Sequence, residues 1–240
     1  MLTKSKKQEV YTETDRALLT ASVQGKLTNV RRLLKNGAKP NALTQDRNKR
    51  SALILASAAG HKNVVIELLR VGANVNYKDN AGLSAISWAA IRGKNQIAKV
   101  LVSWNADINN HDNNENTPLM YAVGTHNIEL LKMLALKGAD LEVKSRVQKM
   151  TPMLVAIKNK DTEVIKALLE LGANINSANH EGFTPLMAAA ESGQFMIVQT
   201  LMAHGAKNNI HDITGMTATI LAKKNGHKQV AQLLNSLPYR

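Results

Sequence analysis

The sequence predicts an all-α solenoid, in which short helix pairs stack on one another instead of folding around a single core. The first observation is a Gly-Ala dipeptide at residues 37, 72, 138, 172 and 205, with Asn105-Ala106 in the one gap. The steps between these positions are 35, 33, 33, 34 and 33 residues. The second observation is that 44% of the residues are apolar but only 3% are aromatic. Small aliphatic side chains must therefore form the core, which suits thin layers of closely packed helices.

Residues 79–111 illustrate one repeat. Asp79-Asn80-Ala81-Gly82 is a turn sequence, because Asn, Asp and Gly tolerate positive φ. Ser84 follows as the expected N-cap of a short first helix. A second helix is expected from about Asn95 to Ser103, with apolar residues three and four positions apart. Asn105 should end it in the left-handed conformation.

The other repeats follow the same order. First helices are expected to begin after a Ser or Thr N-cap, in three cases with Pro at the first helical position; these caps are Ser51, Ser84, Thr117, Thr151, Thr184 and Thr217. Leu134, Leu168 and Leu169 in the second helices are expected to be buried between layers. We expect a polar tail over residues 1–14, a repeat domain over 15–236 and a C-terminal tail over 237–240. The expected units are approximately 15–45, 46–78, 79–111, 112–145, 146–178, 179–211 and 212–236.

These repeats resemble the ankyrin repeat over nearly the whole chain. The resemblance rests on Thr-Pro-Leu-x-x-Ala at 117–122 and 184–189, Gly-His at 60–61 and 226–227, and Gly-Ala-Asn-Val-Asn at 72–76. It implies that each unit is a β-turn finger followed by two antiparallel helices. It also implies that partners bind the fingers and the inner face formed by the first helices.

The chain departs from the family pattern at two kinds of position. The fourth residue of Thr-Pro-Leu-His is never His; it is Ile54, Ser87, Met120, Leu154, Met187 or Ile220. The Gly that ends the first helix is replaced by His126 in one unit and by Lys160 in another. The missing His predicts less rigid contacts between neighbouring turns, and the two Gly replacements predict strain in the middle of the stack, or adaptation to a partner.

No pattern indicates chemistry. The chain lacks Cys, and its 7 histidines include no His-Glu-x-x-His pair. His61 and His227 occupy the Gly-His position and are interpreted as structural. No phosphate-binding loop or nucleophile elbow occurs. We therefore expect no catalytic residue, no metal and no cofactor, and we expect that the protein is not an enzyme.

The charge favours an acidic partner. Lys and Arg number 31 against 18 Asp and Glu, a net charge of +13, and such a field accelerates encounters with acidic surfaces. Nucleic acid is the rival partner, disfavoured because stacking aromatics are scarce on the fingers. No apolar stretch is long enough to span a membrane. The N-terminus has no apolar leader segment, and the compartment stays unknown from the sequence: we expect the cytoplasm as the sequence stands, or the periplasm or secretion if a signal peptide has been removed.

Aligning the units predicts which side chains face a partner on the fingers and the first-helix face. The predicted residues are Arg47, Lys49, Arg50, Lys78, Leu83, Ile91, Arg92, His111, Tyr121, Arg146, Val147, Lys149, Met150, Lys158, Phe183 and Met216. The basic members would steer the encounter, and the apolar members would supply a buried centre. Trp104, at the end of a second helix, either packs on the following unit or anchors a partner.

The predicted function is protein binding by a monomer. Because no second module is evident, we favour a stoichiometric inhibitor or an immunity-type protein that covers an acidic face of its target. An adaptor or scaffold, or a nucleic-acid-binding protein, is the alternative.

Overall fold

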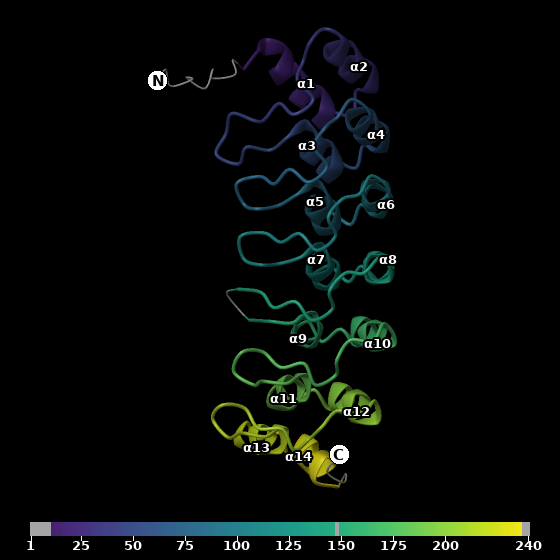
Figure 1. Cartoon of the computed structure of the whole chain (residues 1–240). Coiled ribbons are helices and arrows are strands. Elements are labelled where there is room, and N and C mark those ends of the chain that lie inside the picture. The colour runs from purple at the N-terminus through teal and green to yellow at the C-terminus, as the bar shows by residue number, and fades with distance from the viewer. Residues whose placement is uncertain (1–10, 147–148, 237–240) are drawn as a thin grey trace, which may run out of the picture. The chain divides into compact units, whose positions relative to one another are not determined.

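The structure, a computed structural model, describes residues 11–146 and 149–236. These residues contain fourteen helices in the predicted pairs, joined by extended finger loops (Figure 1). Within the described ranges the β structure is limited to one isolated bridge, between Leu43 and Ser51 at the base of the first finger. The chain divides into two compact units, Met1–Asp107 and Ile108–Arg240, which are described separately.

The first unit contains three helix pairs: α1 (Glu13–Val23), α2 (Leu27–Lys35), α3 (Ala52–Ala59), α4 (Lys62–Arg70), α5 (Ala85–Ile91) and α6 (Asn95–Ser103). The first helices α1, α3 and α5 pack side by side in one layer, and α2, α4 and α6 form a second layer. Leu53, Leu68 and Leu101 are fully buried between the layers. The core is therefore a thin layer of aliphatic side chains between the two layers of helices, as the composition predicted.

The second unit contains four pairs: α7 (Pro118–Gly124), α8 (Ile128–Leu136), α9 (Pro152–Lys158), α10 (Thr162–Glu170), α11 (Pro185–Glu191), α12 (Phe195–Ala203), α13 (Ala218–Lys224) and α14 (Lys228–Ser236). The first helices α7, α9, α11 and α13 pack in sequence. Leu134 and Leu168 are fully buried, as expected. The expectation for Leu169 was wrong, since this side chain is half-buried. Successive helical residues lie about 100° apart around the axis, so Leu169 falls on the edge of the buried face.

The predicted helix starts are confirmed. Each of the six Ser or Thr caps accepts a hydrogen bond from the backbone N–H three residues later. Pro118, Pro152 and Pro185 occupy the first helical turn, where a missing N–H costs nothing. The second helix of the repeat at 79–111 spans Asn95–Ser103, as predicted.

Left-handed residues end the helices where glycine is absent. Asn105 has φ 58°, His126 has φ 55° and Lys160 has φ 57°, against φ 90° at Gly60 in the corresponding first-helix position. L side chains adopt this conformation at a cost of about 1–2 kcal/mol. The middle of the chain thus carries backbone strain at His126 and Lys160, the two positions where a residue other than glycine ends a first helix.

The Gly-His positions serve packing between repeats. The ring of His61 lies against Gly25, where any Cβ would collide with it, and its Nε2 is 2.8 Å from the carbonyl oxygen of Val23. His227 makes the same contacts with Gly193 and with the carbonyl of Glu191, at 2.9 Å. Both histidines are therefore structural.

His126 reverses this arrangement. It stands in the glycine position, and its Nδ1 lies 2.5 Å from Oδ2 of Asp161, which occupies the histidine position of the next repeat. The two repeats thus still make a polar contact through an imidazole ring, but here the ring comes from the earlier repeat, whereas His61 and His227 come from the later one.

A second set of hydrogen bonds runs from repeat to repeat at the finger bases. Asn41 accepts from the backbone N–H of Asn74 at 2.8 Å, and Asn176 from that of Lys207 at 2.9 Å. The last polar residue of the Gly-Ala-Asn-Val-Asn pattern therefore fixes the register between neighbours. None of the helices within the described residues is long and apolar enough to cross a membrane.

Candidate functional site

The fingers are closed by an acidic or amide side chain at their start. In four of them Oδ1 of this residue accepts the backbone N–H groups two and four residues later, at 2.8–3.0 Å. The four residues are Asp79, Asp112, Asn179 and Asp212. The hydroxyl of Thr214 and the N–H of Met216 lower the pKa of Asp212. The finger tips are thus held by internal hydrogen bonds and present their remaining side chains in fixed positions.

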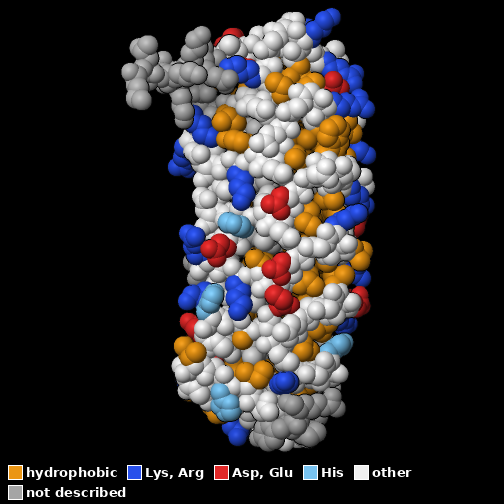
Figure 2. All heavy atoms as spheres, viewed as in Figure 1, with side chains coloured by type: hydrophobic (Ala, Val, Ile, Leu, Met, Phe, Trp, Pro, Cys, Tyr) orange, Lys and Arg blue, Asp and Glu red, His pale blue; other side chains and the backbone are white. Residues whose placement is uncertain are grey.

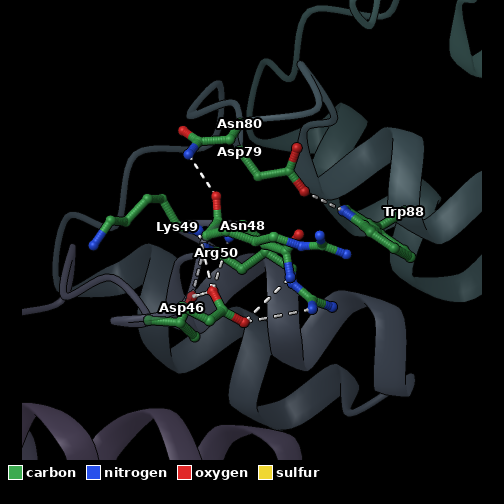
Figure 3. A network of polar contacts seen from close by, with 9 residues as sticks. Asp46, Asn48, Lys49, Arg50, Asp79, Asn80 and Trp88 are labelled. Atoms are coloured by element: carbon green, nitrogen blue, oxygen red, sulfur yellow. Dashed lines mark hydrogen bonds and ion pairs between the residues drawn. The ribbon is translucent and has the colours of Figure 1, made fainter.

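In the first unit, the first two fingers are tied together. The N–H of Asn80 donates to the carbonyl oxygen of Asn48 at 2.9 Å, and its side-chain amide donates to that of Arg47 at 2.6 Å. The hydroxyl of Tyr77 donates to the carbonyl of Lys49 at 2.7 Å. Figure 3 shows Asn48 and Asn80 facing each other across the two fingers. The basic side chains of these fingers therefore project from one hydrogen-bonded pair of loops.

Trp88 lies where the second finger meets α5. Its Nε1–H donates to Oδ2 of Asp79 at 2.9 Å (Figure 3). The guanidinium carbons of Arg50 and Arg92 lie 5.4 Å and 5.8 Å from the centroid of its ring, within the range of cation–π attraction. A guanidinium nitrogen of Arg50 is 3.9 Å from Oδ2 of Asp46. Two fixed cations thus share one aromatic ring.

Sequence reasoning did not select Trp88. A signal was present, because Tyr121 stands at the same position of the next first helix, where its hydroxyl donates to Asp112. The corresponding residues of other units are aliphatic, as at Leu55 and Val155. The signal is an aromatic residue four positions after the N-cap together with an Asp five positions before the N-cap. This pair of residues indicates a hydrogen bond between the finger and the first helix.

In the second unit, Arg146 connects two fingers. Its Nε–H lies 3.2 Å from the carboxylate of Glu115, and its backbone N–H donates to the carbonyl of Asn114 at 2.7 Å. Its side chain remains 69% exposed.

Two other exposed side chains of the second unit stand at a finger tip and a helix end. Ile213, at the tip of the last finger, is 75% exposed. Lys158 is exposed at the end of α9.

The predicted partner-facing residues differ in accessibility. Exposed members are Arg47, Lys78, Arg92, His111, Arg146, Lys149 and Lys158; half-buried members are Lys49, Arg50, Ile91, Tyr121, Met150, Phe183 and Met216. Val147 lies outside the described residues.

Leu83 was expected at the surface, and this was wrong, because it is only 8% exposed. Its N–H and carbonyl close the finger on Asp79. It also directly precedes the N-cap Ser84, a position whose apolar side chain commonly packs on the helix that follows.

Trp104 is 40% exposed at the C-terminal end of α6.

Lys and Arg side chains are spread over the visible face of the molecule, with acidic residues between them (Figure 2). In the part of the chain that the structure describes, no cluster of three His, Asp or Glu side chains could hold a metal ion. The fingers thus present exposed Lys and Arg side chains on loops that internal hydrogen bonds hold in place.

The comparisons with known proteins agree with this architecture. The family model for ankyrin repeats (3 copies) matches residues 2–79, 18–112, 65–145 and 141–212. The chain is 31% identical over 172 residues to the ankyrin repeat and KH domain-containing protein mask-1 of Caenorhabditis elegans, covering 70% of this chain and 6% of that protein. The chain spans less than two thirds of the length of the first curated relatives that it matches.

Two solved structures are similar over most of their length. The ankyrin repeat domain of Bcl-3, a member of the IkappaB protein family, superposes with a TM-score of 0.84 at 25% identity, covering 91% of this chain and 97% of that one. The human ASB11 ankyrin repeat domain gives a TM-score of 0.77 at 28% identity, covering 92% and 98%. With its repeated fingers and helix pairs, the chain belongs to the ankyrin-repeat family and is a protein–protein interaction module.

Proposed function

We propose that this protein binds the acidic face of a partner protein without catalysing a reaction, and that it acts as a stoichiometric inhibitor or immunity-type protein. The observation that carries the proposal is the pair of tied fingers at residues 44–50 and 77–83 in the first unit. Arg47 and Lys78 are exposed on them, and Arg92 is exposed on the adjoining helix. A rigid basic surface loses little conformational freedom on binding, which favours recognition of a folded acidic surface.

Inhibition is the form of binding that we favour over scaffolding. A repeat surface that covers the face of an enzyme blocks substrate access without any chemistry of its own. We also propose that the protein is a monomer when no partner is bound.

The test uses a partner captured from the native organism and identified by mass spectrometry. Arg47→Glu with Lys78→Glu reverses two exposed finger cations, and Lys35→Glu with Arg70→Glu reverses two exposed second-helix cations as a matched control. We expect the finger variant to slow association and to weaken its dependence on salt, because charges at the rim of an interface act mainly on the association rate. The control variant should change association much less.

Inhibition is measured separately, as the activity of the partner during titration with this protein. Activity should fall linearly and reach its minimum at one molecule of inhibitor per target. Full partner activity in a saturated complex would favour the scaffold instead. Equal losses of association rate in both charge variants would remove the fingers from the interface, and tighter binding to duplex DNA than to any protein would favour the nucleic-acid alternative.

A further inference from the structure

The cluster of Trp88, Arg50 and Arg92 contains guanidinium N–H groups that, among the described residues, donate no hydrogen bond to a carboxylate. Asp79 already accepts three N–H groups, from Ala81 and Leu83 through Oδ1 and from Trp88 through Oδ2. These bonds fix the carboxylate beside the edge of the indole ring. Asp79 therefore positions Trp88 and does not pair with either arginine.

Asp46 is occupied in a similar way. Its oxygens accept from the hydroxyl of Thr44 at 2.6 Å, from the amide side chain of Asn48 at 3.2 Å, and from the backbone N–H groups of Asn48 and Lys49 at 3.0 and 3.2 Å. Its contact with Arg50, at 3.9 Å, is longer than a hydrogen bond. Most of the donor groups of Arg50 are thus left without a carboxylate partner.

Arg92 is the accessible member of the cluster. It follows the last residue of α5, its side chain is exposed, and it makes no ion pair with another residue in the described ranges. Its guanidinium lies over the same ring as that of Arg50. Stacking on an aromatic ring holds a guanidinium in place while its edge keeps N–H donors for a planar acceptor. Asp46 forms an ion pair with Arg50 at 3.9 Å, so an incoming anion would act mainly on the guanidinium of Arg92.

We propose that Arg92, in cation–π contact with Trp88 beside Arg50, is a recognition site for a carboxylate of the partner, supplied by an Asp or Glu side chain on its contact face. The geometry suits this ligand because a guanidinium fork pairs with a carboxylate through two parallel N–H bonds. The inference rests on the proposed function and narrows it, since it makes one carboxylate the centre of the first-unit contact.

The experiment uses the fluorescence of Trp88. The chain has two tryptophans, so Trp104→Phe leaves Trp88 as the sole reporter. The full-length single-tryptophan protein is titrated with a hexaglutamate peptide, and with hexaglutamine as the uncharged counterpart. We expect a saturable change in emission with the glutamate peptide and none with the glutamine peptide.

Arg92→Gln and Arg70→Gln, each made in the Trp104→Phe protein, separate a specific site from general charge. Both remove one exposed cation at the end of a helix, α5 or α4. We expect Arg92→Gln to raise the dissociation constant of the peptide about tenfold, as the loss of a charged hydrogen bond does. Arg70→Gln should change it less than twofold by long-range charge alone. Arg92→Lys should not restore affinity, because an ammonium lacks the planar fork.

Three outcomes would overturn the inference. These are equal weakening by Arg92→Gln and Arg70→Gln, full rescue by Arg92→Lys, or tighter binding of single-stranded DNA than of hexaglutamate at the same site. Far-UV circular dichroism of each variant checks that the helices remain folded.

The inference and the proposed function fail in different ways. If Arg92→Gln leaves the captured partner bound but reversal of Arg47 and Lys78 releases it, the carboxylate site is wrong and the proposed function stands. If hexaglutamate binds at Trp88 but the protein forms no stoichiometric protein complex, the site stands and the proposed function is wrong.

Discussion

Replacing Lys160 by glycine should stabilise the protein. Lys160 holds φ 57° at the end of α9, in a position where Gly60, Gly193 and Gly226 stand in other repeats. Its backbone N–H donates to the carbonyl of Ile157 at 2.9 Å, a bond that glycine retains. Within the described residues its exposed side chain makes no hydrogen bond or ion pair that the substitution would remove.

The expected gain is the difference between two terms. Removing a side chain from the left-handed conformation recovers about 1–2 kcal/mol. The greater freedom of glycine in the unfolded chain takes back about 0.5–1 kcal/mol. The net stabilisation of Lys160→Gly is therefore about 0–1.5 kcal/mol.

The measurement is the urea midpoint of unfolding, followed by far-UV circular dichroism, with the slope of the transition compared between variants. His126→Gly is the matched variant. It relieves the same backbone strain but removes the 2.5 Å contact between His126 and Asp161. Its gain should therefore be smaller than that of Lys160→Gly. A lower midpoint for Lys160→Gly at unchanged slope would show that backbone strain does not limit stability at this position.

Two further predictions concern the second unit. Leu168→Ala should destabilise the protein by about 2–5 kcal/mol, because it empties a fully buried position; an unchanged melting temperature would contradict the assigned packing. The pKa of Asp212 is lowered by hydrogen bonds from Thr214 and Met216, so its contribution to stability is present above the unfolded pKa of about 3.9 and is lost as pH falls through the lower folded pKa. An NMR titration of the Asp212 carboxyl carbon should give a midpoint below this unfolded value, and a midpoint at or above it would refute the finger geometry.

The candidate site was predictable in part. Exposure of Arg47 and Arg92 followed from the phase of the repeat, because turn tips and helix ends recur at fixed offsets from Gly-Ala. The burial of Leu83 did not follow, because a residue at a finger base turns inward only when the finger closes on Asp79. The grouping of Arg50 with Trp88 was also hidden, since these residues lie in successive repeats, 38 positions apart in the sequence.

The repeat period, the helix pairs and their caps could all be predicted from the amino-acid sequence. These depend on local chemistry: a Ser or Thr such as Thr117 bonds the backbone of its own first turn, and Gly or Asn105 takes the left-handed conformation through its own backbone freedom. The contacts between repeats became visible only in the folded structure. The contacts of His126 with Asp161 and of Arg50 with Trp88 depend on how one repeat is set against the next. That setting is a sum of many side-chain contacts across the layer, which no single repeat encodes in its own sequence.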